Sequence, residues 1–244
     1  MNRIQSVDVI RLLGMIAVIA IHTTPFKLNI QNDEGIYKYL FILINQVSRF
    51  AVPFFFVISG YFWGTKVRNT NQLIEHTFVM AKRVGIVFFS WSFIYFYTVF
   101  SLFYNEGLLN LLNTIYIKNT HFDALEVFSS LLLQGTKSHL WFLSALLVAL
   151  GICTVFIRLK LLKSLVVLSI LLYIIGVLSK AYADTPVGIK IEFNTLYGPF
   201  FGTIFFTSGY IISGLVITKK WLIYGVFKWC YFTLYRNLSP MAEL

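Results

Sequence analysis

The chain has 244 residues, of which 58% are hydrophobic and only 12% charged, and its formal net charge is +10. A soluble domain is about 45–50% apolar and about 25% charged, so this chain has more apolar surface than a soluble core of its size can bury. The composition excludes a soluble globular protein and predicts an all-α integral membrane protein. The basic residues form short clusters between apolar runs, where membrane topology accounts for them, and we expect no nucleic-acid binding.

Apolar runs of about 20 residues, long enough to cross a bilayer, predict a polytopic bundle of six to seven transmembrane helices. Six runs have this length: 8–26, 39–64, 79–103, 140–157, 163–180 and 198–218. A seventh run, 221–235, is shorter and contains Lys228. We therefore expect one transmembrane domain over residues 1–220, followed by a short apolar run and a polar tail over 221–244.

The first predicted helix, 8–26, contains two polar residues that do not suit a lipid-facing segment. Arg11 lies near its start, where it can pair with Asp8, whereas His22 lies deep in the apolar run. Eleven residues at 100° each turn about 20° past three full turns and rise about 16.5 Å. Both side chains therefore point the same way, which suggests one cavity with a cation at its mouth and a titratable group at its depth. A histidine that only hydrogen-bonds a neighbouring helix is an equal alternative.

The second predicted helix, 39–64, contains Arg49 near its middle. An arginine at the centre of a span costs at least about 2.5–3.5 kcal/mol on insertion scales, so we expect it to face a polar cavity or an anionic partner. A buried ion pair that only fixes packing is the alternative. Pro53 is expected to kink this helix.

The same helix ends in a small and polar tripeptide, Ser59, Gly60 and Tyr61. The same tripeptide recurs at 208–210, where close helix packing is the favoured role.

The third predicted helix, 79–103, opens with Lys82 and Arg83, which can bind phosphates, although topology alone also places cations there. The long loop 104–138 has apolar residues at helical spacing and predicts two interfacial or re-entrant helices. The helix that follows opens with HLWFL, in which Trp141 alone is ordinary at a membrane interface and gains interest from His139 beside it.

The charged segments between the runs orient the bundle. With a cytoplasmic N-terminus, the cytoplasmic segments hold most of the basic residues, whereas the opposite segments hold more acidic than basic ones. This alternation is what the positive-inside rule predicts.

The two cysteines, Cys153 and Cys230, form no CxxC pair and have no histidine cluster nearby, so we predict neither a metal site nor a bound cofactor.

Taken in order, these segments resemble the membrane-bound acyltransferase family 3. The residues that carry the resemblance are Arg11 and His22, the segment RFAVPFFFVISGY from Arg49 to Tyr61, the pair Lys82 and Arg83, and HLWFL at 139–143. Each piece is weak alone, but the ordered set is fairly specific. The resemblance runs from about residue 7 to residue 220.

The resemblance implies a multi-pass protein of the bacterial plasma (inner) membrane that carries out O-acetylation or a related acyl transfer. The donor would be cytoplasmic acetyl-CoA or another acyl-CoA, and the acceptor a hydroxyl of a surface glycan or lipid-linked saccharide in polysaccharide modification. It implies that His22 and Arg11 are essential to the transfer and that the Ser59–Tyr61 segment lines the site. Lys82 and Arg83 would lie near the phosphates of the donor. The lipid bilayer is the remaining expected partner, and the oligomeric state is open.

Acyl transfer from a thioester to a sugar hydroxyl needs a base, because a hydroxyl is a poor nucleophile until its proton is removed. A neutral imidazole suits that task, so we assign His22 as general base. Arg11 would anchor the donor or stabilise the developing oxyanion. An acyl-imidazole relay through His22 is equally compatible with the residues.

Two other functions are open on the sequence. Intramembrane ionisable residues also occur in transporters, so Arg11, His22 and Arg49 could line the export path of a polysaccharide or small solute. Members of the family also continue through further helices, where this chain has the polar tail YRNLSPMAEL. A shortened homologue or an inactive, truncated remnant is therefore the third alternative.

Overall fold

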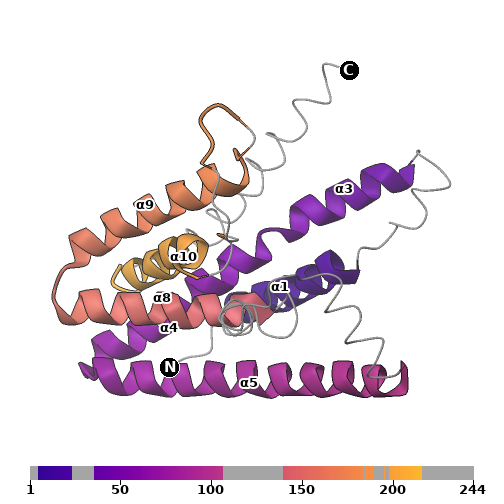
Figure 1. Cartoon of the computed structure of the whole chain (residues 1–244). Coiled ribbons are helices and arrows are strands. Elements are labelled where there is room, and N and C mark those ends of the chain that lie inside the picture. The colour runs from indigo at the N-terminus through magenta and orange to yellow at the C-terminus, as the bar shows by residue number, and fades with distance from the viewer. Residues whose placement is uncertain are drawn as a thin grey trace.

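The computed structural model describes residues 5–23, 36–106, 140–183, 185–189, 195 and 198–215. Every regular element in this part of the chain is an α-helix, as the all-α prediction required (Figure 1). The helices are α1 (Gln5–Thr23), α3 (Ile36–Ser48), α4 (Ala51–Thr70), α5 (Leu73–Glu106), α8 (Trp141–Arg158), α9 (Leu162–Lys180) and α10 (Pro199–Ile212).

Four segments of the described chain are long and apolar enough to cross a membrane, and they cover 37–70, 73–95, 141–158 and 162–180. Helix α10 is as apolar but shorter, with 14 residues. These spans confirm a multi-pass membrane protein. The count of six to seven spans and the cytoplasmic N-terminus stay predictions. The interfacial helices of the 104–138 loop lie outside the described residues, except that α5 extends through 104–106, and the run 221–235 lies outside them altogether.

The second predicted span is two helices, because the chain turns at Arg49 and Phe50 between α3 and α4. Pro53 lacks the N–H that would donate to the carbonyl of Arg49, and its ring would clash with that carbonyl in a continuous helix. The kink expected at Pro53 appears as an interruption of the α-helical hydrogen bonding at Arg49 and Phe50, whose N–H groups donate to the carbonyls of Gln46 and Val47 at 3.3 and 3.5 Å. Residues 37–70 still form one candidate span, which includes the predicted 39–64 and is divided into α3 and α4 at the kink.

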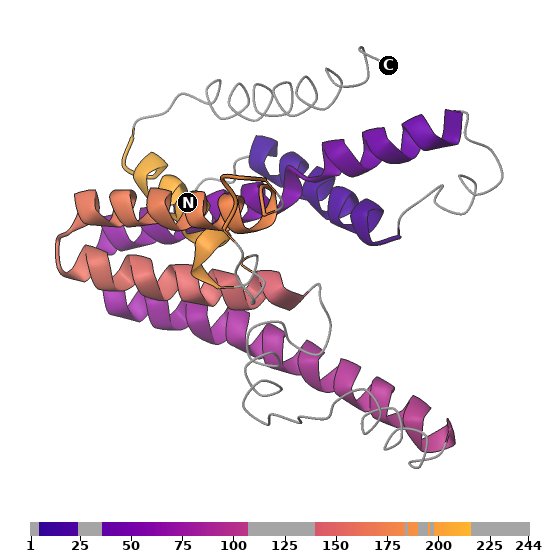
Figure 2. The ribbon, with the colours of Figure 1, turned by 45° about the horizontal axis from the view of Figure 1, so that its top comes forward.

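Helix α10 lies at the centre of the described bundle and packs against α4, α8 and α9, while α5 packs against α8 (Figures 1 and 2). The two Ser-Gly-Tyr tripeptides meet where α4 and α10 cross. A Cβ on Gly60 would collide with the backbone oxygen of Phe206, and a Cβ on Gly209 would collide with that of Val57. Both glycines therefore allow the two backbones to touch, which confirms the packing role expected of the second tripeptide.

Polar side chains join the helices inside this apolar bundle. Thr77 on α5 lies 3.0 Å from the hydroxyl of Thr154 on α8 and accepts a hydrogen bond from the indole of Trp63 on α4 at 3.3 Å. Cys153 is fully buried, and its sulfur lies 3.3 Å from the hydroxyl of Thr207 on α10. In a medium without water these bonds satisfy groups that would otherwise be costly to bury.

Candidate active site

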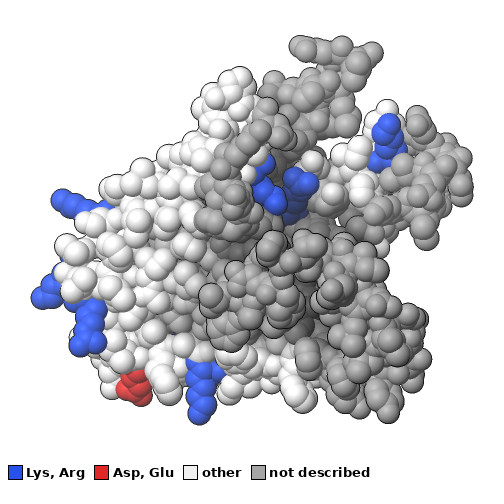
Figure 3. Space-filling model, in the orientation of Figure 1, with Lys and Arg blue, Asp and Glu red and all other residues white. Residues whose placement is uncertain are grey.

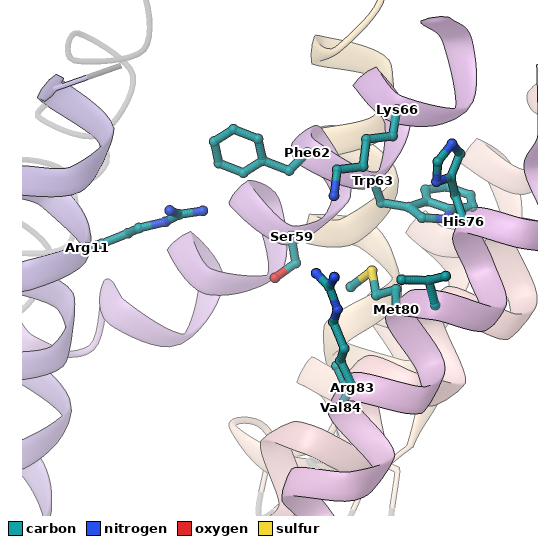
Figure 4. Close-up of a pocket in the computed structure, with 10 residues that line it drawn as sticks. Arg11, Ser59, Phe62, Trp63, Lys66, His76, Met80, Arg83 and Val84 are labelled. Atoms are coloured by element: carbon teal, nitrogen blue, oxygen red, sulfur yellow. The ribbon is translucent and has the colours of Figure 1, made fainter. Parts of the chain in front are cut away.

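A cavity of about 460 Å³ lies between α1, α4 and α5 (Figure 4). Its polar lining consists of Arg11 from α1, Ser59 and Lys66 from α4, and His76 and Arg83 from α5. The side chains of Arg11, Lys66 and Arg83 converge toward Ser59 in Figure 4. The remaining wall is apolar and comprises Phe62, Trp63, Val79, Met80 and Val84. None of the described residues that line the cavity is acidic.

The spacing of the lining residues explains why two helices form most of the cavity. On α4 they occupy positions 59, 62, 63 and 66, and on α5 positions 76, 79, 80, 83 and 84. Steps of three and four residues put each set on one helix face. The two helices are joined by a tight turn at Asn71, which adopts a left-handed conformation with φ of 58° and donates its N–H to the carbonyl of Val67 at 2.9 Å. The hairpin thus brings the lining faces of α4 and α5 to the same cavity.

Arg11 closes the cavity from α1. Its guanidinium carbon lies 4.6 Å from the centre of the Phe62 ring, a cation–π geometry that ties α1 to α4. One guanidinium nitrogen also lies 3.6 Å from a carboxylate oxygen of Asp8. Both members of this ion pair are partly exposed, so it orients the arginine more than it stabilises the fold. The predicted pairing of Arg11 with Asp8 is confirmed.

His76 is held at the hairpin end of the cavity. Its Nε2 lies 2.8 Å from the hydroxyl of Thr70, and that hydroxyl donates to the carbonyl of Lys66 at 2.9 Å. The sequence interpretation missed both His76 and Lys66. The signal that could have found them is their helical register with Arg83 and Ser59, on faces that only the hairpin brings together.

The predicted site residues fall into two groups. Arg11, Ser59 and Arg83 line the cavity. Lys82 is exposed on α5 and outside the lining, although it adjoins Arg83 in the chain. Gly60 is buried in the crossing with α10, and the half-buried Tyr61 places its ring 5.3 Å from that of Phe62.

The remaining predicted residues lie outside the cavity lining. His22 is exposed near the far end of α1, Arg49 is exposed at the turn between α3 and α4, and Trp141 opens α8 in a half-buried position. His139 lies outside the described residues. The structure therefore brings Arg11 together with Arg83 and Ser59, and it leaves His22 at the other end of the same helix.

A cavity whose described lining has three cations and no acidic residue favours a ligand with several negative charges. Arginine binds phosphate through two parallel hydrogen bonds, and lysine adds a point charge. The apolar wall of Phe62, Trp63 and Met80 offers an adjoining surface for an uncharged part of the same ligand. The arrangement suits a phosphate-bearing molecule that also has an apolar or flat group.

The family model of the acyltransferase 3 domain, described as an acyltransferase domain, matches residues 4–235. The chain belongs to the acyltransferase 3 family. This match covers nearly all of the chain and confirms the resemblance seen in the ordered motifs.

Two curated proteins of Enterococcus faecalis, both named amino-acid racemase, are similar to this acyltransferase 3 chain. One is 30% identical over 93% of the chain, and the other is 25% identical over 86%. The matched parts make up 29% and 28% of those proteins, so the chain spans less than a third of the length of either. No solved structure matches the chain.

Proposed function

We propose that this chain is a membrane O-acyltransferase that moves an acyl group, in the simplest case acetyl, from acyl-CoA to a hydroxyl of a cell-surface carbohydrate. Family membership supports acyl transfer as the type of reaction. The observation that carries the choice of donor is the cavity, in which Arg11, Lys66 and Arg83 converge and none of the described lining residues is acidic. Coenzyme A carries a pyrophosphate and a 3′-phosphate, which match such a cluster of cations.

The distance between Arg11 and His22 along α1 can be explained by the length of the CoA molecule. With its phosphates among the cations, its flexible pantetheine arm would extend along α1 and carry the thioester toward His22, about 16.5 Å farther along the helix. The acceptor hydroxyl would reach His22 from the opposite membrane face. In this proposal the donor enters from the cytoplasm, the acceptor binds from outside, and the membrane between them is a bacterial plasma membrane.

The transfer at His22 follows from ordinary acyl chemistry. The imidazole takes the proton of the acceptor hydroxyl while the oxygen attacks the thioester carbonyl carbon. The new ester C–O bond forms, the C–S bond breaks, and the proton passes to the sulfur of the departing CoA. An alternative with the same products has His22 accept the acyl group first as an acyl-imidazole and pass it to the hydroxyl.

The donor assignment is tested by the thermal stability of the detergent-solubilised protein with CoA, dephospho-CoA and pantetheine. A ligand that binds the folded state raises the melting temperature, so we expect the largest shift with CoA and little shift with pantetheine, which lacks the phosphates. Arg83→Gln should weaken CoA binding by roughly 10- to 100-fold, the effect of losing a hydrogen bond to a charged group.

Lys82→Gln is the matched control, since it removes a neighbouring positive charge that is outside the cavity lining. It should leave CoA binding close to that of the unmodified chain. Equal losses in the two variants, or equal shifts with CoA and pantetheine, would contradict a phosphate site in this cavity.

A further inference from the structure

The turn between α8 and α9 ends α8 in a Schellman motif. The N–H of Leu161 donates to the carbonyl of Phe156 at 2.9 Å, and the N–H of Lys160 donates to the carbonyl of Ile157 at 3.0 Å. This pair of bonds requires a left-handed residue at the position of Lys160, whose φ is 59°. These two hydrogen bonds hold Lys160 in the left-handed conformation.

Lysine is an unusual residue at this position. The left-handed conformation crowds any side chain with a Cβ, so glycine is usual there and asparagine is the common substitute. The turn between α4 and α5 follows the rule, with Asn71 at a φ of 58°. A charged residue in a strained backbone conformation suggests that its side chain has a function that glycine could not provide.

Lys160 belongs to a compact basic group at the tip of the α8–α9 hairpin. Arg158, Lys160 and Lys163 are all exposed, and none of them forms an ion pair with a described residue. Leucines alternate with them along the chain, and their exposed fractions are 60% for Leu159, 46% for Leu161 and 38% for Leu162. Figures 1 and 2 show this turn at one extremity of the described bundle, and Figure 3 shows basic side chains at that end.

The lengths of the two helices place this tip at the level of lipid headgroups. The 18 residues of α8 rise about 27 Å and the 19 of α9 about 28.5 Å, close to the roughly 30 Å thickness of the hydrocarbon layer. The exposed leucines then lie at the boundary of the acyl chains, and the three basic side chains reach the layer where phosphates lie.

We propose that Arg158, Lys160 and Lys163 form a binding site for anionic phospholipid headgroups at the tip of the α8–α9 hairpin. The three cations lack protein counter-charges among the described residues, and the leucines between them are exposed. The helix lengths place the cations at the level of the phosphates and the leucines beside the acyl chains. This site lies on other helices than the proposed donor cavity and does not depend on it.

The test uses the full chain in a neutral detergent, with dioleoylphosphatidylglycerol or dioleoylphosphatidylcholine added. We expect the anionic lipid alone to raise the melting temperature, and we expect added NaCl to reduce the shift by screening. In Lys160→Gly the concentration of phosphatidylglycerol that gives half of the shift should rise roughly fivefold, the equivalent of one basic residue at a membrane surface.

Lys160→Gly also separates lipid binding from folding, because glycine relieves the left-handed strain. Without lipid this variant should melt at the same or a higher temperature than the unmodified chain. Asn71→Gly is the matched control, as it places glycine at the other left-handed turn and should leave the response to phosphatidylglycerol unchanged.

Three results would overturn the site. The first is a Lys160→Gly protein that responds to phosphatidylglycerol like the unmodified chain, which would leave Lys160 as a helix cap. The second is an equal shift with phosphatidylcholine. The third is an equal shift with inorganic phosphate alone, which would assign the cations to a free anion.

The double variant Arg158→Gln with Lys163→Gln changes two positions without backbone strain. It should lose more of the lipid response than Lys160→Gly.

Discussion

The two faces of α4 differ in how tightly they pack. Toward α10 the helix presents Gly60 and Gly64, which leave no room for a further carbon atom. Toward the cavity it presents Ser59, Phe62 and Lys66, whose side chains border open space. Ser59 and Gly60 are adjacent in the chain and point about 100° apart, so they belong to neighbouring faces of α4. The cavity wall therefore adjoins a glycine seam, formed by Gly60 and Gly64, in which the backbones of α4 and α10 touch.

The largest expected effect comes from breaking the seam. Gly60→Ala places a Cβ against the backbone oxygen of Phe206, which no side-chain rotation can relieve. Overpacking costs about 1–3 kcal/mol where side chains can move, and we expect at least the upper end of that range here. The yield of monodisperse protein in size-exclusion chromatography should fall sharply.

Gly151→Ala is the control for that substitution, because a Cβ at Gly151 meets nothing within 4 Å. Alanine is the better helix former, so this change should stabilise the protein by about 0.5–1 kcal/mol. A Gly60→Ala protein that melts like Gly151→Ala would show that the seam tolerates expansion.

The next prediction concerns the reaction at His22 on α1, and the substitution does not touch the glycine seam. His22→Ala should lower CoA release from acetyl-CoA in the presence of a glycan acceptor by roughly 10²- to 10⁴-fold, the usual contribution of a general base. Binding of CoA to the cavity should not change, since His22 is outside its lining. Full turnover by the variant would remove His22 from the reaction. Transport of the glycan across vesicles without any CoA release would favour export over acyl transfer.

The smallest effect concerns the contact between Arg11 and Phe62 that joins α1 to the wall. Phe62→Leu keeps the apolar volume but removes the ring, and an exposed cation–π contact is worth about 0.5–1 kcal/mol, or roughly a two- to fivefold loss of CoA affinity. Phe62→Tyr keeps the ring and should bind CoA normally. An unchanged CoA titration in Phe62→Leu would mean that Arg11 is positioned by Asp8 instead.

Helix positions could be predicted where the apolar run and the helix coincide. The predictions 140–157 and 163–180 agree closely with α8 and α9. Helix α5 begins at Leu73, before the predicted 79, because its first turn carries Glu75 and His76 and extends beyond the apolar run. Hydropathy detects the part of a helix that lies in hydrocarbon, and it does not detect a polar extension of the same helix.

The site is harder to predict because it depends on which helix faces meet. The sequence and the geometry of one helix indicate a cavity at Arg11, and Arg11 is among the described lining residues. The same reasoning places His22 in that cavity, whereas the described lining does not include it. This reasoning cannot show that the partners of Arg11 include Lys66 and His76, which lie on a hairpin whose packing is set by the glycine seam. Similarly, Lys82 and Arg83 are equivalent in the sequence, but only Arg83 lines the cavity.

The burial of Cys153 is of practical use for mapping the membrane topology. Its thiol has no accessible surface and contacts Thr207 in the centre of the bundle, so a water-soluble maleimide should reach it only when the helices separate. The chain has one other cysteine, Cys230. With Cys230→Ser as background, cysteines introduced at the helix ends can report which side of the membrane they face. The native Cys153 would serve in the same sample as an internal gauge that the bundle is intact.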